Sequence, residues 1–298
     1  MSEPPAVAEL PAASVRIVAP GPLSTVQDLG RPGLAHLGVT RAGAADRPSL
    51  RLANRLVGNL PGAAAIETTY GGLVVSFLAP TMIAVTGAPC PLELAGRPVG
   101  MYAPVDVPAG ARLRIDAPDR GVRSYLAIRG GVDVPAVLGS RSRDTLAGIG
   151  PEPLAVGSVL ALGREAGPPP TVDLAPQARY ADEPVLRVIP GPRDDWFTAE
   201  SVAGLWAGAY EVSADSDRVG ARLRGPVVRR RTSDELPSEG VVAGAVQIPR
   251  DGQPVVFLAD HPVTGGYPVL GVVVPDDLAL AAQCRPGQHL RLRPCRQG

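Results

Sequence analysis

The sequence predicts a mainly β fold divided into two domains, with a few short helices. First, short apolar segments rich in Val, Ile, Leu and Tyr recur between Gly, Pro and Asp residues, which is typical of strands and turns. Second, the 34 prolines and 35 glycines occur in a chain that is 45% hydrophobic, so they indicate many turns and not disorder. Third, a proline-rich stretch interrupts the pattern near the middle of the chain. Repeated strands and turns of this kind favour barrels or sandwiches.

The 298 residues are enough for two domains, each with its own core. Residues 1–13 are expected to form a disordered tail, and residues 14–163 the N-terminal β domain. Residues 164–184 are expected to be a linker, because three consecutive prolines favour an extended connection. Residues 185–298 are expected to form the C-terminal β domain.

In the first half, strands are expected at 15–18, 73–77, 82–86, 92–94, 112–116 and 123–128. A helix is expected after Asp46, which is a suitable N-cap, with Pro48 in the first turn where its missing N–H does no harm. Apolar residues follow at helical spacing, and Gly58 and Asn59 provide a stop.

In the second half, strands are expected at 185–189, 210–213, 242–248, 255–259, 267–274 and 289–293. Short helices are expected at 194–206, with an aspartate cap, and at 276–283. Asp251-Gly252 lies between two of these strands and is a strong signal for a hairpin turn.

The charges exclude several kinds of chemistry. The 29 basic and 29 acidic residues balance, so the composition indicates no nucleic-acid or membrane partner. The chain has no lysine, which excludes a Schiff base, a phosphate-loop lysine and covalently attached biotin. An anion would therefore have to be held by arginine or by backbone N–H groups.

Three cysteines (Cys90, Cys284 and Cys295) are too few and too scattered for a disulfide framework. The first residues lack the basic region and apolar run of a signal peptide, and no segment has the apolar length of a membrane span, so a cytoplasmic location is expected. The three histidines do not have zinc-ligand spacing, and no G-x-S-x-G or G-x-G-x-x-G motif occurs in a suitable context.

The stretch 26–59 places many ionisable and amide side chains among glycines. Buried polar groups cost free energy unless they find partners, and glycines permit tight backbone turns. The stretch therefore predicts either a binding loop that runs into the N-terminus of a helix or an ordinary long surface connection, and the two interpretations are equally favoured.

Three further groups are candidates. Glu67 lies before a Gly-Gly pair, where it could orient an arginine or hold a substrate amide, although an exposed strand-edge position is slightly favoured. Arginines 129, 141 and 143 suit carboxylate or phosphate recognition, with a solvated loop the commoner explanation for the last. The third group forms either exposed ion pairs or a site around Gly220, and its members are Asp215, Asp217, Arg218 and Arg222.

The stretch 238–268 carries the last candidate group. Asp260 ends a strong strand, so its side chain is placed on a rigid element. Thr264, Gly265 and Gly266 offer a hydroxyl and backbone N–H groups suited to an anion. His261 could act as a general base beside that acid, but a solvated histidine in a turn is the simpler interpretation.

Seven segments between residues 15 and 293 resemble the family of bacterial 5-oxoprolinase C subunits, also known as the biotin-dependent carboxyltransferase or allophanate hydrolase subunit 2 family. They are STVQDLGRPG, GVTRAGAADRPSLRLANRLVGN, AAIETTYGG, RSYLAIRGGVDVPAVLGSRS, YEVSADSDRVGARLRGP, LPSEGVVAGAVQIP and DHPVTGGYPVLGVV. Their number, order and spacing identify the chain as a member of this family.

The resemblance implies two linked β-barrel domains, the C-terminal one cyclophilin-like. It also implies two partners, namely the 5-oxoprolinase B subunit, encoded by an adjacent gene, and a separate A subunit. Together the three would use ATP, with or without magnesium, to open the small molecule 5-oxoproline to L-glutamate. Homologous modules form the carboxyltransferase part of urea carboxylase, where biotin is carried on another domain. Another relative binds an inhibitor of a sporulation kinase.

Family motif positions supply the expected site. The expected catalytic residues are Asp28, Arg31, Asp46, Arg218 and Asp260. The expected substrate-binding residues are Gln27, Asn54, Glu67, Asp217, Glu239, Gln247, Thr264, Gly265, Gly266 and Tyr267, and no metal site is expected. In this scheme arginines and the 264–266 backbone stabilise developing negative charge, and aspartates position water or an ATP-bound metal ion.

Two positions depart from the family pattern, with Ala42 in place of a common serine and Arg143 in place of a threonine.

Three functions remain open. The leading one is the C subunit of a 5-oxoprolinase, active only with its partners. The others are the carboxyltransferase component of a biotin-dependent urea or amide carboxylase, and a non-catalytic protein that sequesters a kinase-inhibitor-like partner.

Overall fold

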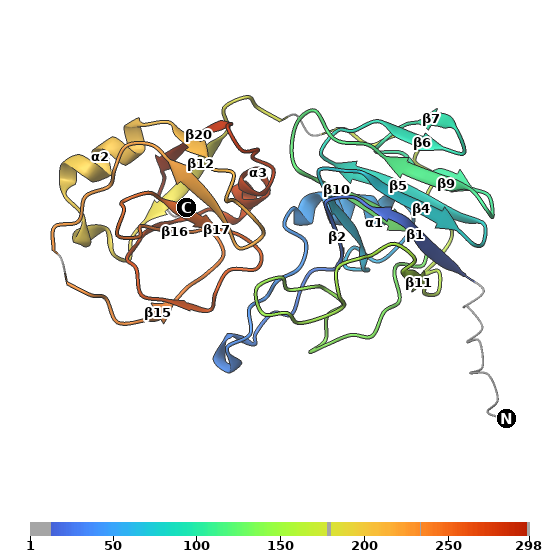
Figure 1. The fold of residues 1–298 in the computed structure, drawn as a ribbon, viewed down its shortest axis with the longest axis horizontal. Helices are drawn as coiled ribbons and strands as arrows, with labels where there is room; N and C mark the ends of the chain where they lie inside the picture. Colours follow the sequence, from blue (N-terminus) through green and yellow to red (C-terminus); the bar gives the residue numbers. More distant parts are fainter. Residues whose placement is uncertain (1–12, 178–179, 233, 297–298) are drawn as a thin grey trace.

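The computed structural model describes residues 13–177, 180–232 and 234–296. The two halves of the chain form two β lobes that lie side by side (Figure 1). The prediction of a mainly β fold with a few short helices is confirmed. The expected tail falls outside the described residues except for residue 13. Within the described ranges, no helix is long and apolar enough to cross a membrane.

Two antiparallel sheets form the first domain, in the orders β11-β1-β4-β9-β6-β7 and β2-β3-β10-β5-β8. They enclose one apolar core, to which Ile17, Phe77 and Leu113 contribute from one sheet and Ile66 and Leu126 from the other. The domain expected as a barrel is thus a pair of facing sheets whose pairing does not close into a ring within the described residues. The strands are β1 (Ser14–Pro20), β2 (Leu23–Gln27), β3 (Ala65–Thr69), β4 (Leu73–Phe77), β5 (Thr81–Gly87), β6 (Leu92–Leu94), β7 (Arg97–Val99), β8 (Val105–Val107), β9 (Arg112–Ile115), β10 (Arg123–Ile128) and β11 (Val159–Ala161).

The second domain is a closed barrel in the order β12-β19-β16-β17-β14-β13-β20. Its strands surround a core that includes Leu186, Tyr210, Leu223 and Leu270. The predicted hairpin is confirmed, because β16 and β17 pair antiparallel across the turn that contains Gly252. The strands are β12 (Val185–Pro190), β13 (Tyr210–Val212), β14 (Gly220–Arg224), β16 (Ala245–Gln247), β17 (Val255–Phe257), β19 (Val269–Val273) and β20 (His289–Pro294), and β15 (Glu239–Gly240) and β18 (Thr264–Gly265) form a separate two-stranded ribbon.

Helix α1 (Arg47–Leu56) begins as predicted, because Asp46 accepts a hydrogen bond from the Ser49 N–H at 3.0 Å. The prediction of a helix at 194–206 with an aspartate cap is wrong about where the helix begins. The chain forms a 3-10 turn, η2 (Asp194–Trp196), and then α2 (Ala199–Ala207), because Thr198 is extended and caps the Ser201 N–H. The last expected helix is η3 (Pro275–Asp277) followed by α3 (Leu278–Ala282), and a further 3-10 turn, η1 (Ala35–Leu37), precedes α1.

Much of the expected linker packs against the first domain. Arg129 donates to the carbonyl of Gly167 and forms an ion pair with Glu165 at 2.8 Å. The buried Ala175 donates its N–H to the carbonyl of Tyr102 at 2.8 Å. The connection that is free of both domains is therefore shorter than the proline content indicates.

Candidate functional site

A buried ion-pair cluster joins the two domains. Arg218, just before β14, donates Nε and Nη2 to the Asp260 carboxylate at 2.9 and 3.1 Å and Nη1 to Glu67 of the first domain. Nη2 also donates to the Gly43 carbonyl at 2.7 Å. Burial opposes the charge of Arg218, but Glu67 and Asp260 outweigh it and raise the pKa of the guanidinium. Arg218 is therefore charged, and each of its three nitrogens already has an acceptor.

Glu67 lies in the interior, so the favoured interpretation of an exposed strand-edge residue is wrong. Its side chain is 1% exposed, because β3 lies between β2 and β10. Its second oxygen accepts hydrogen bonds from the Tyr125 hydroxyl at 2.7 Å and the Ala45 N–H at 3.1 Å. Burial raises the pKa of Tyr125, and the neighbouring carboxylates Glu67 and Asp46 raise it further.

Asp46 links the helix cap to the second domain. Besides capping α1, it accepts a hydrogen bond from Gln283 Nε2 at 2.9 Å. The oxygen of the same Gln283 amide accepts the N–H groups of Val122 and Arg123 at 2.8 and 2.9 Å. Burial raises the pKa of Asp46, against hydrogen bonds from Gln283 and Ser49 that lower it. Gln283, which sequence reasoning missed, thus bridges the domains.

Asp28 fixes the first loop to the loop 140–145. Its carboxylate accepts four hydrogen bonds of 2.6–2.7 Å, from Gly30 N, Ser140 Oγ, Ser142 Oγ and Arg141 N. A carboxylate with this many donors is an anchor for two loops. It has little remaining capacity to act on a substrate.

Arg31 is buried beside the same loop and donates to the carbonyls of Val137 and Ser142. Three buried polar atoms here have no partner among the described residues, namely Arg31 Nη1, Asp144 Oδ2 and Gln27 Oε1. Burial lowers the pKa of Arg31 and raises that of Asp144. Thr145 connects this loop to the interdomain cluster by donating its N–H and hydroxyl to Asp260 at 2.9 and 2.7 Å.

Asn54 and Asp217 also bind their own backbone surroundings. Asn54 is fully buried and donates to the Ala63 carbonyl at 2.8 Å. Asp217 accepts the N–H groups of Val219 and Gly220 at 2.8 and 3.1 Å, but it is exposed and lines an interdomain cleft.

The remaining expected residues form a separate rim cluster on the barrel: Glu239, Gln247, Thr264, Gly265, Gly266 and Tyr267. Glu239 lies opposite Gly265 in the β15–β18 ribbon and forms an ion pair with Arg193, whose hydrogen bond lowers the pKa of that carboxyl. Gln247 donates to the Tyr267 carbonyl at 3.0 Å, and the Arg230 guanidinium lies 5.6 Å from the Tyr267 ring centre. Figure 1 places β15 at the edge of the barrel away from α1 and α3.

The expected single pocket is therefore divided. Asp260 joins the first-domain loops at the interface. The segment 264–267 belongs to the rim cluster, because the chain after Asp260 turns away and pairs with residues near β15, where Val241 donates to the Val263 carbonyl at 2.8 Å.

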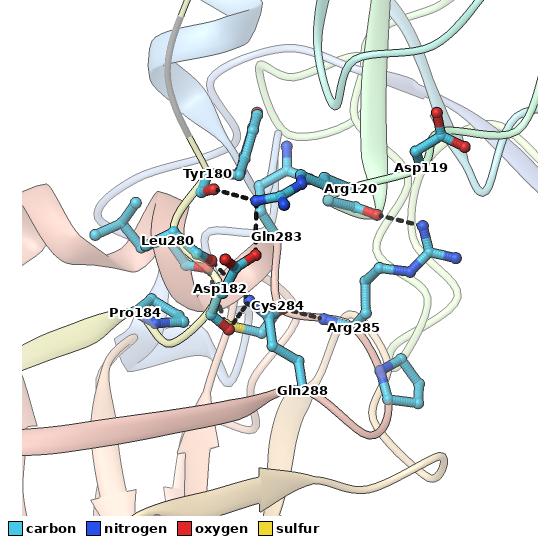
Figure 2. Close-up of a pocket in the computed structure, with 13 residues that line it drawn as sticks. Asp119, Arg120, Tyr180, Asp182, Pro184, Leu280, Gln283, Cys284, Arg285 and Gln288 are labelled. Atoms are coloured by element: carbon cyan, nitrogen blue, oxygen red, sulfur yellow. Dashed lines mark hydrogen bonds and ion pairs between the residues drawn. The ribbon is translucent and has the colours of Figure 1, made fainter.

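Two clefts open between the domains, and Cys284 lines both of them. The first, of about 370 Å³, is drawn in Figure 2, where Arg120 donates to the Tyr180 carbonyl and pairs with Asp182 at 2.7 Å. The second, of about 250 Å³, is lined by Arg123, Asp217 and Arg218 among others. Burial raises the pKa of the Cys284 thiol to about 12, so it is not a thiolate nucleophile at neutral pH.

A third and smaller space, which we call the interdomain crevice, has a volume of about 80 Å³. On one side it is lined by the start of α1 and the end of the preceding loop, and on the other by the residues just after β17 and by α3. Arg47 is among the lining residues. Sequence reasoning did not select Arg47. The one feature of the sequence that could have pointed to Arg47 is its position, because a cation begins a helix whose first turn contains no acidic residue.

The candidate side chains fall into two kinds, those whose hydrogen-bonding capacity is used within the chain and those that can still bind a ligand. Glu67, Asp46, Asp28, Arg218 and Asp260 are saturated by intramolecular bonds, so they fix the two domains and the loops around the clefts. No group of three or more His, Cys, Asp or Glu side chains within the described ranges is arranged to hold a metal ion. The groups with spare capacity, such as Asp217 and Arg47, line the interdomain spaces.

The two-sheet domain, the closed barrel and the buried interface between them define a carboxyltransferase-type fold. The model of the family "Carboxyltransferase domain, subdomain A and B" matches residues 37–294, so the chain belongs to this family. The chain is 37% identical to the C subunit of 5-oxoprolinase from Escherichia coli over 284 residues, which cover 94% of this chain and 91% of that protein. It is also 35% identical to the urea amidolyase of Lachancea kluyveri over 93% of this chain but only 17% of that protein.

Comparison with solved structures also places the chain among proteins of this fold. The structure of TTHA0988 superposes with a TM-score of 0.86 at 38% identity and covers 96% of this chain. The K. lactis urea amidolyase superposes with a TM-score of 0.88 at 30% identity and covers 97% of this chain. The chain spans about half of the TTHA0988 chain, 56%, and 19% of the urea amidolyase.

Proposed function

We propose that the protein is the C subunit of an ATP-dependent 5-oxoprolinase, a hydrolase of cyclic amides that acts in the cytoplasm with an A and a B subunit. The observation that carries this proposal is the similarity to the E. coli C subunit through 91% of that protein, against 17% of a urea amidolyase. A second 5-oxoprolinase C subunit, from Haemophilus influenzae, is 33% identical over 90% of this chain.

The proposed reaction opens a lactam to L-glutamate. The ring amide is unreactive, so the terminal phosphoryl group of ATP is transferred to the lactam oxygen. ADP leaves, water adds to the activated carbon, and the C–N bond breaks, which gives the free amine and an acyl phosphate. A second water then hydrolyses the acyl phosphate to the carboxylate of glutamate and inorganic phosphate. Phosphoryl transfer depends on positioning and on charge stabilisation, and a rigid pair of domains is suited to both.

The saturated ion pairs change the roles proposed for the candidate residues. Arg218, Asp46 and Asp260 are positioning residues in this proposal, because their bonding capacity is used within the chain. Arg31 retains one unpartnered buried nitrogen and remains the stronger candidate for a direct contact. ATP, with or without magnesium, enters as a substrate of the assembled complex.

A partner requirement follows from the same proposal. The relatives are named as subunits, which supports an assembly in which this chain alone turns over no substrate. The 5-oxoprolinase B subunit is the proposed direct partner, and the A subunit then completes the complex.

Carboxyl transfer from biotin to urea or a related amide is the second candidate. The superposition on the K. lactis urea amidolyase, with a TM-score of 0.88, favours it. Since the chain has no lysine, biotin would arrive on another chain.

Reconstitution separates the two candidates. The purified A and B subunits of 5-oxoprolinase are mixed with this chain and assayed for glutamate release from 5-oxoproline with ATP. In parallel, the chain is assayed for ATP-dependent carboxylation of urea with a biotin carboxylase and its carrier domain. Glutamate release that requires all three proteins is the expected result. Carboxylation without glutamate release would replace the first proposal by the second.

A further inference from the structure

Arg47 lines the interdomain crevice and has no carboxylate partner among the described residues. Arg218 and Arg123 both lie within 4 Å of Glu67, whereas Arg47 makes a single long hydrogen bond, 3.3 Å, to the Ala42 carbonyl. A partly buried cation without a partner costs free energy, so its retention calls for a ligand or a strong structural reason.

The electrostatic surroundings of Arg47 favour an anion. Burial, together with the nearby cations Arg41 and Arg51, lowers the pKa of Arg47 to about 10. Arg51 lies one helical turn after Arg47 on α1, and like charges at this spacing repel each other. An anion beside Arg47 would relieve both the desolvation and the repulsion.

The interdomain crevice beside Arg47 is small and aliphatic. Pro48 lines it from the first domain, and Leu258, Pro275 and Leu278 line it from the second. The other lining residues in the described part of the chain are alanines, and Arg47 is the one charged side chain among them. Its volume of about 80 Å³ has room for roughly three water molecules, so it can enclose a carboxylate and part of a small ring but nothing near the size of a nucleotide.

We propose that the interdomain crevice binds a small monocarboxylate with a compact, largely apolar ring, and that Arg47 is the partner of its carboxylate. One guanidinium matches one carboxylate, because the planar fork of arginine binds two carboxylate oxygens side by side. Alanine, proline and leucine side chains then contact the ring carbons. The triphosphate of ATP does not fit this chemistry, because it requires several cationic groups.

This inference rests on the proposed function for its choice of ligand, because 5-oxoproline is a five-membered lactam with one carboxylate. It also explains why the crevice is built from both domains. The Arg218–Glu67 ion pair, which joins the two domains, would hold the two walls of the crevice at a fixed separation.

The test measures binding to the full chain by calorimetry and KM in the assembled complex of all three proteins. Ligands are 5-oxoproline, L-proline and 2-pyrrolidinone, the last of which has the ring but no carboxylate. Variants are Arg47→Gln, which removes the charge, and Ala279→Leu, which fills the crevice from α3. Arg55→Gln is the matched control, because Arg55 is an exposed arginine on the same helix outside the crevice.

Removing one charge-assisted interaction predicts a rise in Kd or KM of about ten-fold or more for Arg47→Gln. Ala279→Leu is expected to act in the same direction, and Arg55→Gln is expected to match the parent. Binding of 2-pyrrolidinone is expected to be weak and insensitive to Arg47→Gln.

Unchanged KM for 5-oxoproline in an active complex with Arg47→Gln and Ala279→Leu would overturn the crevice assignment while leaving the proposed function intact. A complex that is inactive on 5-oxoproline, with a chain that still binds a ring monocarboxylate through Arg47, would overturn the function and keep the site.

Discussion

The guanidinium of Arg218, in the second domain, is ion-paired with the carboxylate of Glu67, in the first, and neither side chain is more than 2% exposed. The same guanidinium holds Asp260 of its own domain through two hydrogen bonds. The two domains are therefore joined through charges that water does not reach. Removing one partner of such a pair strongly destabilises the folded protein, because the remaining buried charge is left without compensation.

Replacing Arg218 with alanine is expected to lower the free energy of unfolding by about 3–5 kcal/mol, because two buried carboxylates lose their shared cation. Arg224→Ala is the control, since Arg224 and its partner Asp215 are 66% and 70% exposed. That exposed pair is worth less than about 1 kcal/mol. Urea unfolding monitored by fluorescence measures both values, and equal losses in the two variants would show that the buried pair has no special role.

Gly43→Ala is expected to destabilise the protein more than Gly38→Ala. Both glycines have positive φ angles, 91° and 75°, so each substitution carries a backbone strain of about 1–2 kcal/mol. A Cβ at position 43 would also lie 2.7 Å from the Gly30 nitrogen, whereas position 38 has no heavy atom within 4 Å. Thermal unfolding is the measurement. Equal Tm shifts would contradict the close approach of the two chain segments that supports the Arg218 contact.

Several strands were predictable from local sequence, and β4, β6 and β10 have the predicted bounds. Their residues are mainly apolar and are bounded by turn residues, so the signal is local. β3 and β14 were not predicted, because charged and polar side chains interrupt their apolar pattern. Burial of Glu67 in β3 depends on cations that are distant in the sequence, above all on Arg218, 151 positions later.

The site was partly predictable for the same reason. The polar character of the first loop and the crowding around Gly220 pointed to residues that meet at the interface. The sequence did not separate anchors from free groups, because saturation of a carboxylate such as Asp28 depends on donors from a loop more than 100 residues away. Arg47 was missed because its lack of a carboxylate partner is visible only in three dimensions.

Acidification is expected to destabilise the protein partly through His261. Burial lowers the pKa of His261 in the folded state, while Asp260 and Asp144 act in the opposite direction. The unfolded chain therefore binds the proton more readily, and the stability contributed by neutral His261 is lost as pH falls below about 6.5. His261→Gln is expected to flatten the fall in unfolding free energy between about pH 7 and pH 5. His36→Gln, which alters an exposed histidine, is the control. A wild-type pH profile in the His261→Gln protein would rule out this contribution.

Cys284 is expected to report on separation of the domains. Burial raises the pKa of its thiol to about 12, and Cys284 lines both of the larger interdomain clefts. Alkylation by iodoacetamide near pH 8, followed by mass spectrometry, is expected to be at least about ten-fold slower at Cys284 in the native protein than in the unfolded chain. Arg218→Ala is expected to accelerate it. Native labelling at the unfolded rate would mean that the interface is already open.

The proposed function itself is tested most directly by measuring L-glutamate formed from 5-oxoproline against ATP hydrolysed, with both partner proteins and with this chain present or omitted. We predict glutamate release coupled to ATP hydrolysis only when all three proteins are present. Equal glutamate release by the two partners without this chain, or none from an intact complex of the three, would contradict it.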